Sequence, residues 1–161
     1  MTVFPGAMAF AAAMDLFTMT IPNRISLFLV AAFFFLAPFS GMDLTDFAVH
    51  LAVAFGMLLV GIVFFMRGWM GGGDAKLIAA AALWMGADNI WPYLAAAVVV
   101  GGALGVLLLL YRAIIPPLWL CQQDWAMRLH NKDEGIPYGI ALCAAGLMVY
   151  PSTQWMTNLA G

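Results

Sequence analysis

Long apolar runs separated by short polar connections make up the chain from end to end. Runs of this kind predict helices that cross a membrane, which usually takes about 17–25 residues. The fourth run is the shortest and would span only by tilting, by local thinning of the bilayer or with help from the glycines before it. Six runs can be marked, at residues 3–20, 25–40, 47–66, 75–86, 90–115 and 136–159.

Prolines mark where two of these helices should end. Pro116 and Pro117 follow the fifth run and should stop it, because proline removes a backbone donor and clashes with the preceding turn. Pro151 lies inside the sixth run, where we expect a kink or an end. Residues 111–135 mix tryptophan and leucine with glutamine and charged residues, which predicts a short amphipathic segment at the membrane surface.

Composition agrees with the helical pattern. Of 161 residues, 65% are hydrophobic and 9% are charged, whereas a soluble domain has roughly 25% charged residues. The sequence therefore predicts an all-α polytopic membrane protein with about six transmembrane helices, forming one domain over residues 1–161. The net charge of −2 and the lack of a basic run predict no binding to nucleic acid.

The basic residues fall on one side of this six-helix arrangement. Positively charged connections stay in the cytoplasm, so we expect a cytoplasmic (inner) membrane protein with both termini outside. The N-terminus lacks the basic region of a signal peptide, so the first run is expected to be retained. The basic residues are Arg24, Arg67, Lys76, Arg112, Arg128 and Lys132, and the opposite connections carry Asp43, Asp46 and Asp88.

Asp74 follows three consecutive glycines at the start of the fourth run. Ionisable residues in a membrane segment are functional candidates, and glycines let another chain approach the backbone closely. Two other interpretations are open. Asp is a good helix N-cap, and a glycine-rich loop can bind phosphate, although the GxGxxG spacing and the preceding strand are missing here.

Asp15 is the other carboxylate inside an apolar run near the same membrane face. It could instead extend to the interface or pair with Arg24. If the first and fourth helices are adjacent, the two carboxyls could share one proton, because two close carboxylates cannot both ionise cheaply. The ionised member would take a proton from water while the protonated member donates to the scissile carbonyl, which is metal-free acid–base peptide hydrolysis.

Other polar and aromatic residues are expected to be structural. Cys121 and Cys143 stand alone, and no His/Cys cluster has metal-ligand spacing, so no metal site is expected. His50 is expected to be a packed or interfacial side chain. Five tryptophans near predicted helix ends favour an aromatic belt at the membrane surface. They are Trp69, Trp91, Trp119, Trp125 and Trp155.

Three motifs resemble those of one family. The GxGD signature of intramembrane aspartyl proteases is matched by Gly71-Gly72-Gly73-Asp74, and Lys76 extends the match to the GxGDxK form. Asp15 followed by Ile21-Pro22-Asn23 resembles the first catalytic motif of the type IV prepilin peptidases. The start of their last span is similar to Ile136-Pro137-Tyr138-Gly139. Within that family the chain is similar to the short CpaA/TadV-type members of Flp (Tad) pilus systems.

The resemblance implies a membrane aspartyl endopeptidase that cleaves the N-terminal leader from type IV or Flp prepilins at the cytoplasmic membrane face. It implies Asp15 and Asp74 as the catalytic pair and no cofactor. Longer relatives carry paired CxxC motifs and N-methylate the product, and this chain lacks those motifs, so no methylation is expected. The implied substrate has a short basic leader and an apolar helix in the lipid bilayer. The residues implied in substrate binding or close backbone approach are Gly71, Gly72, Gly73, Lys76, Pro22, Asn23, Pro137 and Gly139.

A function of another class is also open. Buried acids mark ion pathways, so a small transporter, or a pilus or secretion assembly subunit, could use Asp15 and Asp74 as a proton or cation relay. A relay usually needs polar groups through the membrane depth, whereas the mid-span residues here are mostly alanine, leucine, valine, phenylalanine and glycine. Shortening of a co-expressed prepilin would distinguish the two functions.

Overall fold

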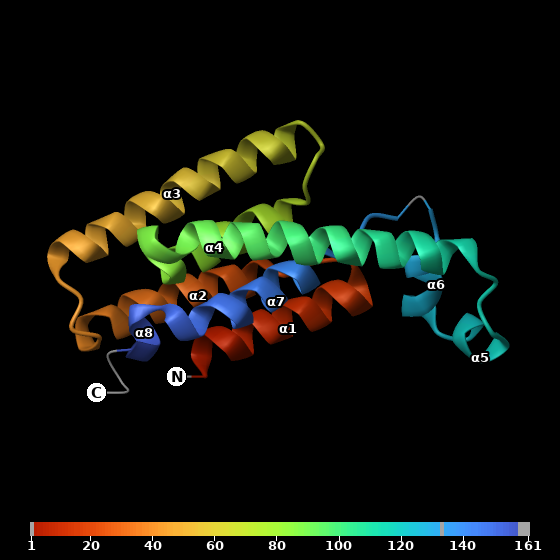
Figure 1. The fold of residues 1–161 in the computed structure, drawn as a ribbon, viewed down its shortest axis with the longest axis horizontal. Helices are drawn as coiled ribbons and strands as arrows, with labels where there is room; N and C mark the ends of the chain where they lie inside the picture. The colour runs from red at the N-terminus through yellow and green to blue at the C-terminus, as the bar shows by residue number, and fades with distance from the viewer. Residues whose placement is uncertain (1, 133, 158–161) are drawn as a thin grey trace.

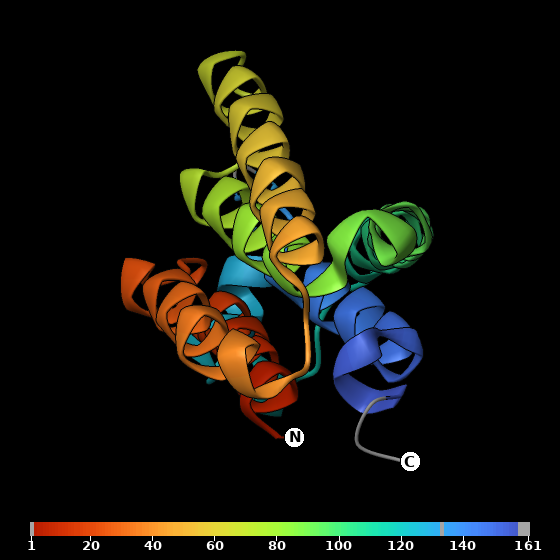
Figure 2. The same ribbon diagram turned by 90° about the vertical axis from the view of Figure 1, so that its left-hand side faces the viewer.

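The computed structural model describes residues 2–132 and 134–157, and every regular element in these ranges is a helix. Figures 1 and 2 show an elongated bundle, with α5 and α6 gathered at one end. In chain order the elements are α1 Val3–Thr18, α2 Asn23–Leu36, η1 Ala37–Phe39, α3 Leu44–Met66, α4 Gly72–Ala113, α5 Leu118–Cys121, α6 Asp124–His130, α7 Tyr138–Val149, η2 Tyr150–Ser152 and α8 Gln154–Thr157.

The most exposed long helix is α3, which leans away from α1, α2 and α7 (Figure 2). Both α3 and α4 are long and apolar enough to cross a membrane, and only 11% of the most apolar part of α3 is buried. A helix that is so apolar and yet so exposed is suited to a lipid environment. Shorter apolar helices lie at Val3–Thr18, Asn23–Phe39 and Tyr138–Ser152. The prediction of an all-α membrane protein is therefore confirmed.

Gly86 divides α4 into two helices, and the second runs back along the bundle (Figure 1). Its φ of 66° and ψ of −171° lie in a region of backbone conformation that is open essentially only to glycine. The division falls between the predicted runs 75–86 and 90–115, so the sequence located this boundary correctly. The shortness of the fourth run is thus a real feature of the fold.

The break at Gly86 leaves backbone carbonyls without helical partners, and two side chains supply donors. His50 Nδ1 on α3 lies 2.6 Å from the Leu83 carbonyl oxygen, and the indole Nε1 of Trp155 donates to the Trp84 carbonyl at 3.0 Å. A carbonyl oxygen only accepts, so His50 carries its proton on Nδ1. The ring of His50 is 5% exposed, which agrees with the expectation of a packed histidine.

The predicted aromatic belt is wrong for one of its five members. Trp155 is 1% exposed, and its ring centroid lies 4.8 Å from that of Trp84 and 5.3 Å from that of Phe33. It is a core residue because α8 folds back against the break in α4. Trp69, Trp91 and Trp119 are exposed, as a belt requires, and Trp125 is partly buried.

Helix ends follow the prolines as expected. α4 ends at Ala113, ahead of Pro116, and α7 ends at Val149, so that Pro151 lies in η2. The sixth predicted run continues to residue 159, and its last two positions lie outside the described residues. The predicted amphipathic segment forms α5 and α6, and α6 buries Ala126 and Leu129.

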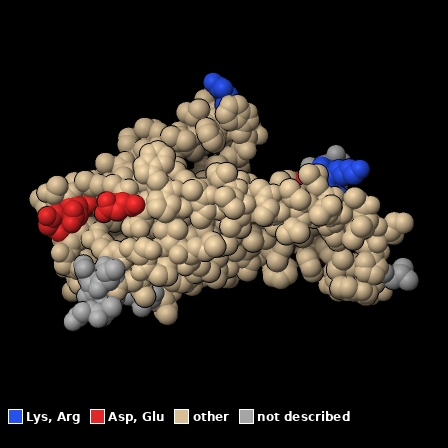
Figure 3. All heavy atoms as spheres, in the orientation of Figure 1, with Lys and Arg blue, Asp and Glu red and all other residues tan. Residues whose placement is uncertain are grey.

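The basic side chains gather away from one acidic end of the bundle. Figure 3 shows acidic side chains at the end where α2 connects to α3, and basic side chains at the top and at the far end. This arrangement matches the partition of charges in the sequence. The orientation of the bundle in the membrane remains a prediction.

Substitution of Gly86 by alanine should destabilise the fold. The new Cβ would lie 2.5 Å from His50 Nε2, and the backbone conformation is strained for any residue with a Cβ. Strain of this kind costs on the order of 1–3 kcal/mol, so the midpoint of thermal unfolding in detergent should fall. Gly56→Ala on α3 is the matched control, because nothing lies within 4 Å of its Cβ and alanine favours helix over glycine. An equal midpoint for the two variants would contradict this account of the break.

Candidate active site

Asp15 lies in the last turn of α1 with its carboxyl inside the protein. The side chain is 5% exposed, so it does not extend to the surface. Its Oδ2 accepts a hydrogen bond from the backbone N–H of Gly139 at 2.7 Å. Gly139 is the second residue of α7, after the N-cap Pro137, and such an N–H has no partner within its own helix. Asp15 therefore bonds to the start of α7, whereas the side chain of Arg24 is exposed.

Asp74 lies in the first turn of α4, three residues after the N-cap Gly71. Its carboxylate accepts a hydrogen bond from the backbone N–H of Gly71, which is the reciprocal contact that an acidic residue makes three positions after an N-cap. The interpretation of Asp74 as a capping residue is thus partly correct, with the cap itself at Gly71. The other carboxylate oxygen, Oδ1, is buried and has no hydrogen-bond partner among the described residues. A buried carboxylate oxygen without a hydrogen-bond partner is rare, and it marks Asp74 as a candidate functional group.

The two carboxyls lie at the same end of the bundle, close enough for a charge on Asp15 to act on Asp74. Ile21, in the connection after α1, lies between the starts of α4 and α7. A Cβ at Gly73 would lie 3.0 Å from Ile21 Cβ, and a Cβ at Gly139 would lie 3.0 Å from Ile21 Cδ1. The starts of α4 and α7 therefore approach the same side chain at positions where only glycine fits without displacement.

A cavity of about 580 Å³ opens beside Asp74. Its walls come from the end of α3, the glycine loop and the start of α7, and they include Phe64, Trp69, Ile136 and Tyr138. The volume lies within the roughly 300–1,000 Å³ typical of ligand sites. Asp15 is not part of the lining, so a bound group would meet Asp74 first.

The predicted substrate-binding residues fall into two groups. Gly71 and Gly139 bond to the carboxyls, Gly73 lies against Ile21, and Pro137 is the N-cap of α7. A Cβ at Gly72 would lie 3.2 Å from the ring of Phe65. Lys76 and Asn23 are elsewhere. Lys76 Nζ donates to Asn23 Oδ1 at 2.8 Å, beside a groove that shares no lining residue with the Asp74 cavity. Pro22 is the N-cap of α2 and directly precedes Asn23 in the chain.

Two arginines that the sequence did not single out as site residues hold the surrounding backbone. Arg112 donates from Nε to the Leu129 carbonyl at 2.8 Å and from Nη2 to the Glu134 carbonyl at 2.9 Å. Arg128 Nη2 donates to the Phe17 carbonyl at 2.6 Å. These bonds fix the end of α1 and the segment that leads into α7, next to the bond between Asp15 and Gly139. Arg112 lies near the end of an apolar run and Arg128 lies in the amphipathic segment, so the sequence marked both only as cytoplasmic charges.

Tyr93 is a further residue near Asp74 that the motifs do not mark. It is fully buried on the second half of α4, and its hydroxyl has no partner among the described residues. The hydroxyl lies near enough to Asp74 and Cys143 to interact electrostatically with both. Tyr93 reaches this position because α4 turns back at Gly86. Within the described residues, no three His, Cys, Asp or Glu side chains come together as a metal site would require.

Comparison with known proteins identifies the class. The sequence model of the type IV leader peptidase family matches residues 2–110, which include both aspartates, the glycine loop and the break in α4. The chain therefore belongs to the type IV leader peptidase family, whose members are hydrolases. Searches among curated proteins and among solved structures found no match.

Substitution of Gly139 by alanine should disturb Asp15 directly. The added Cβ would lie 2.8 Å from Asp15 Oδ2 and 3.0 Å from Asp15 Cβ, so the carboxyl must move or lose its hydrogen bond. A displacement of about 1 Å can cost on the order of a hundredfold in rate. Peptidase activity should fall by that order while the protein still inserts at normal levels.

Gly6→Ala is the control for this prediction, because Gly6 lies on α1 with Asp15 and nothing lies within 4 Å of its Cβ. Cleavage of a leader-bearing substrate, measured by gel shift and corrected for protein level, is the readout. Full activity of Gly139→Ala would show that the contact with Asp15 does not matter for the reaction.

Proposed function

We propose that this protein is a membrane aspartyl endopeptidase in which Asp15 and Asp74 form the catalytic pair. The observation that carries the proposal is the arrangement of the two carboxyls and their hydrogen bonds. They lie at one end of the bundle and interact, each accepts one backbone N–H, and Asp74 keeps a buried oxygen without a partner beside a cavity. Membership of a peptidase family supports the same reaction class.

The geometry gives each carboxyl an orientation before substrate arrives. Gly139 N–H holds Asp15, and Gly71 N–H holds Asp74. In the proposed reaction the ionised member of the pair takes a proton from the attacking water, and the protonated member donates a proton to the scissile carbonyl. The water oxygen adds to the carbonyl carbon and gives a tetrahedral diol. When the diol collapses, the C–N bond breaks, the proton held by the first carboxyl passes to the leaving amine, and the second carboxyl takes back a proton from a diol hydroxyl. Backbone-held carboxyls need little rearrangement during these transfers.

We further propose that the substrate is a type IV or Flp prepilin cut at the cytoplasmic face of the inner membrane, with leader cleavage alone as the activity. Three arginines lie at the end of the bundle that holds the aspartate pair. Arg67 is the C-cap of α3, Arg112 bonds to the segment before α7, and Arg128 bonds to the end of α1. By the positive-inside rule that end faces the cytoplasm. The cavity beside Asp74 would hold the extended segment around the scissile bond, and the exposed backbone of the glycine loop would lie close to it.

Replacement of either aspartate by asparagine should abolish cleavage. Asparagine keeps the shape of the side chain but cannot exchange a proton, and general acid–base catalysis contributes about 10²–10⁴-fold to rate. Asp15→Asn and Asp74→Asn should each lose at least the lower figure, and the double variant should be no worse than either single one, because the residues act as a unit. The assay is shortening of a co-expressed prepilin, with membrane levels checked by blot.

Asp88→Asn is the matched control, because Asp88 is exposed just after the break in α4 and should keep most of the activity. Substantial cleavage by either Asp15→Asn or Asp74→Asn would rule out the aspartyl mechanism. Loss of proton or cation transport in those variants, without any cleavage by the wild type, would support the relay function instead.

The orientation of the protein is testable independently of catalysis. Reporter fusions after Arg67 and after Arg128 should give a cytoplasmic signal, and fusions near Asp43 and Asp88 should give an external one, because the basic connections stay inside. A cytoplasmic signal at Asp88 would place the break in α4 on the same side as Asp74 and would contradict the proposed six-span topology.

A further inference from the structure

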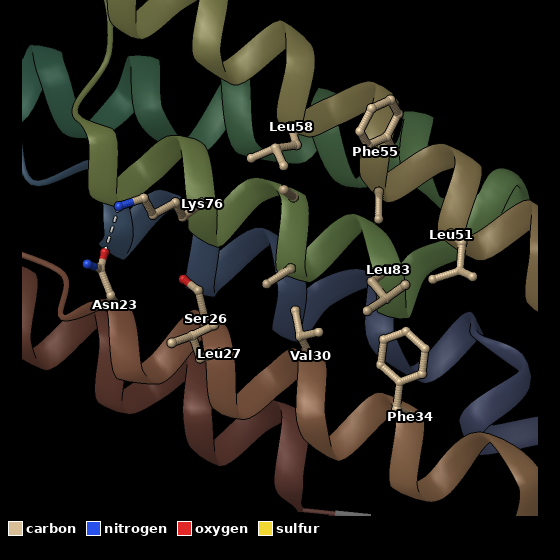
Figure 4. Close-up of a pocket in the computed structure, with 13 residues that line it drawn as sticks. Asn23, Ser26, Leu27, Val30, Phe34, Leu51, Phe55, Leu58, Lys76 and Leu83 are labelled. Atoms are coloured by element: carbon tan, nitrogen blue, oxygen red, sulfur yellow. Dashed lines mark hydrogen bonds between the residues drawn. The ribbon is translucent and has the colours of Figure 1, made fainter.

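A second hollow, separate from the Asp74 cavity, lies between α2 and α3 with the first half of α4 as its floor (Figure 4). Its volume is about 500 Å³. We call it the α2–α3 groove. α3 contacts α4 at both ends of this floor. Gly61 packs against Ala75 at one end, and His50 bonds to the Leu83 carbonyl at the other. Between these points α3 and α2 stand apart, and the space faces the region where lipid would surround the bundle.

Polar groups occur at only one end of the α2–α3 groove. Lys76 and Asn23 lie there, joined by a hydrogen bond of 2.8 Å (Figure 4). Ser26 lies one turn further in. It is 7% exposed, and its Oγ has no hydrogen-bond partner among the described residues. Figure 4 shows this hydroxyl pointing across the groove toward α4. No carboxylate lines the groove, so its polar end is positively charged.

The rest of the groove is apolar over a defined length. On α2 the lining residues from Asn23 to Phe34 cover about 16 Å at 1.5 Å per residue. The hydrocarbon of one leaflet is about 15 Å thick, half of the bilayer core. The groove is thus about half as long as a helix that crosses the membrane, and it begins at the basic end of the bundle.

We propose that the α2–α3 groove binds one acyl chain of an anionic phospholipid from the leaflet at the basic end, with the lipid phosphate on Lys76. The ammonium of Lys76 has three donors, and one is used on Asn23. The others are free for a phosphate, and the Ser26 hydroxyl is placed to donate to an ester oxygen near the head of the chain. Basic pockets between helices on the cytoplasmic side bind anionic head groups in this way. The site does not depend on the proposed peptidase activity.

The first test measures lipid binding by the purified full chain in a neutral detergent. Phosphatidylglycerol should raise the midpoint of thermal unfolding in a concentration-dependent manner, and phosphatidylcholine with the same acyl chains should raise it less. Lys76→Gln should weaken the apparent affinity for phosphatidylglycerol by about fivefold, the effect expected for one basic residue at a membrane surface. Arg67→Gln is the control, because Arg67 is exposed at the same end and does not line the groove.

The second test addresses the acyl chain. Ala54→Phe fills the α2–α3 groove from α3, whereas Ala52→Phe adds the same bulk to an exposed position of α3 outside it. Phosphatidylglycerol that carries a photoreactive acyl chain should label α2 and α3 peptides of the wild type and of Ala52→Phe, and labelling should be lost in Ala54→Phe. The midpoint of thermal unfolding without lipid shows whether each variant is folded.

Three results would overturn the proposal. Equal stabilisation by the two lipids would show that the negative charge of the head group does not contribute to binding. Undiminished affinity of Lys76→Gln for phosphatidylglycerol would show that Lys76 does not bind the phosphate. Labelling that survives in Ala54→Phe, or crosslinks from the groove to a second protein chain in native membranes in place of lipid, would show that the groove has another occupant. Glycerol phosphate alone should give no stabilisation, because the acyl chain supplies much of the binding energy.

Discussion

The hydrogen bond from the Gly139 N–H to the Asp15 carboxylate is the contact on which the candidate site depends. A charged or polar group taken out of water needs compensating hydrogen bonds, and inside an apolar bundle few donors exist. The start of a helix supplies one, because its first N–H groups have no partner of their own. The bond also joins the end of α1 to the start of α7, two helices that are far apart in the sequence. The requirement to bury Asp15 thereby determines how these two ends meet.

Glycine makes this meeting possible, and it does so in two different ways. At Gly73 and Gly139 the constraint is space, because Ile21 and Asp15 occupy the positions that a Cβ would take. At Gly86 the constraint is backbone conformation, and the break exposes carbonyls that His50 and Trp155 then bond. At the aspartate end, helices pack closely because glycine leaves room for Ile21 and Asp15. At the opposite end, the side chains of His50 and Trp155 bond to the carbonyls next to the break in α4. Both ends determine where α4 lies, because Asp74 is in its first turn and Gly86 divides it into two helices.

The sequence predicts the helical segments, the break near Gly86 and the two aspartates, because each leaves a local signal. Apolar run length gives the helices, and a carboxylate in an apolar run is unusual wherever it occurs. Trp155 was misassigned because a tryptophan near a helix end gives the same local signal whether the chain continues to the surface or folds back. The roles of Arg112 and Tyr93 were not visible for a related reason. Arg112 meets the Glu134 carbonyl, and Tyr93 comes near Asp74, only after α4 has turned.

The first turn of α4 belongs to both the candidate active site and the α2–α3 groove. Residues two apart on a helix point in directions about 200° apart, so Asp74 and Lys76 face opposite sides of the same turn. A ligand on Lys76 that shifts this turn also shifts the bond between Gly71 and Asp74. Any coupling between two such sites is reciprocal in binding free energy, so a lipid that altered the affinity for substrate would have its own affinity altered by the same factor. Three residues without side chains let this turn lie directly against Ile21 and Phe65, and Asp74 and Lys76 extend from the same backbone toward the two sites.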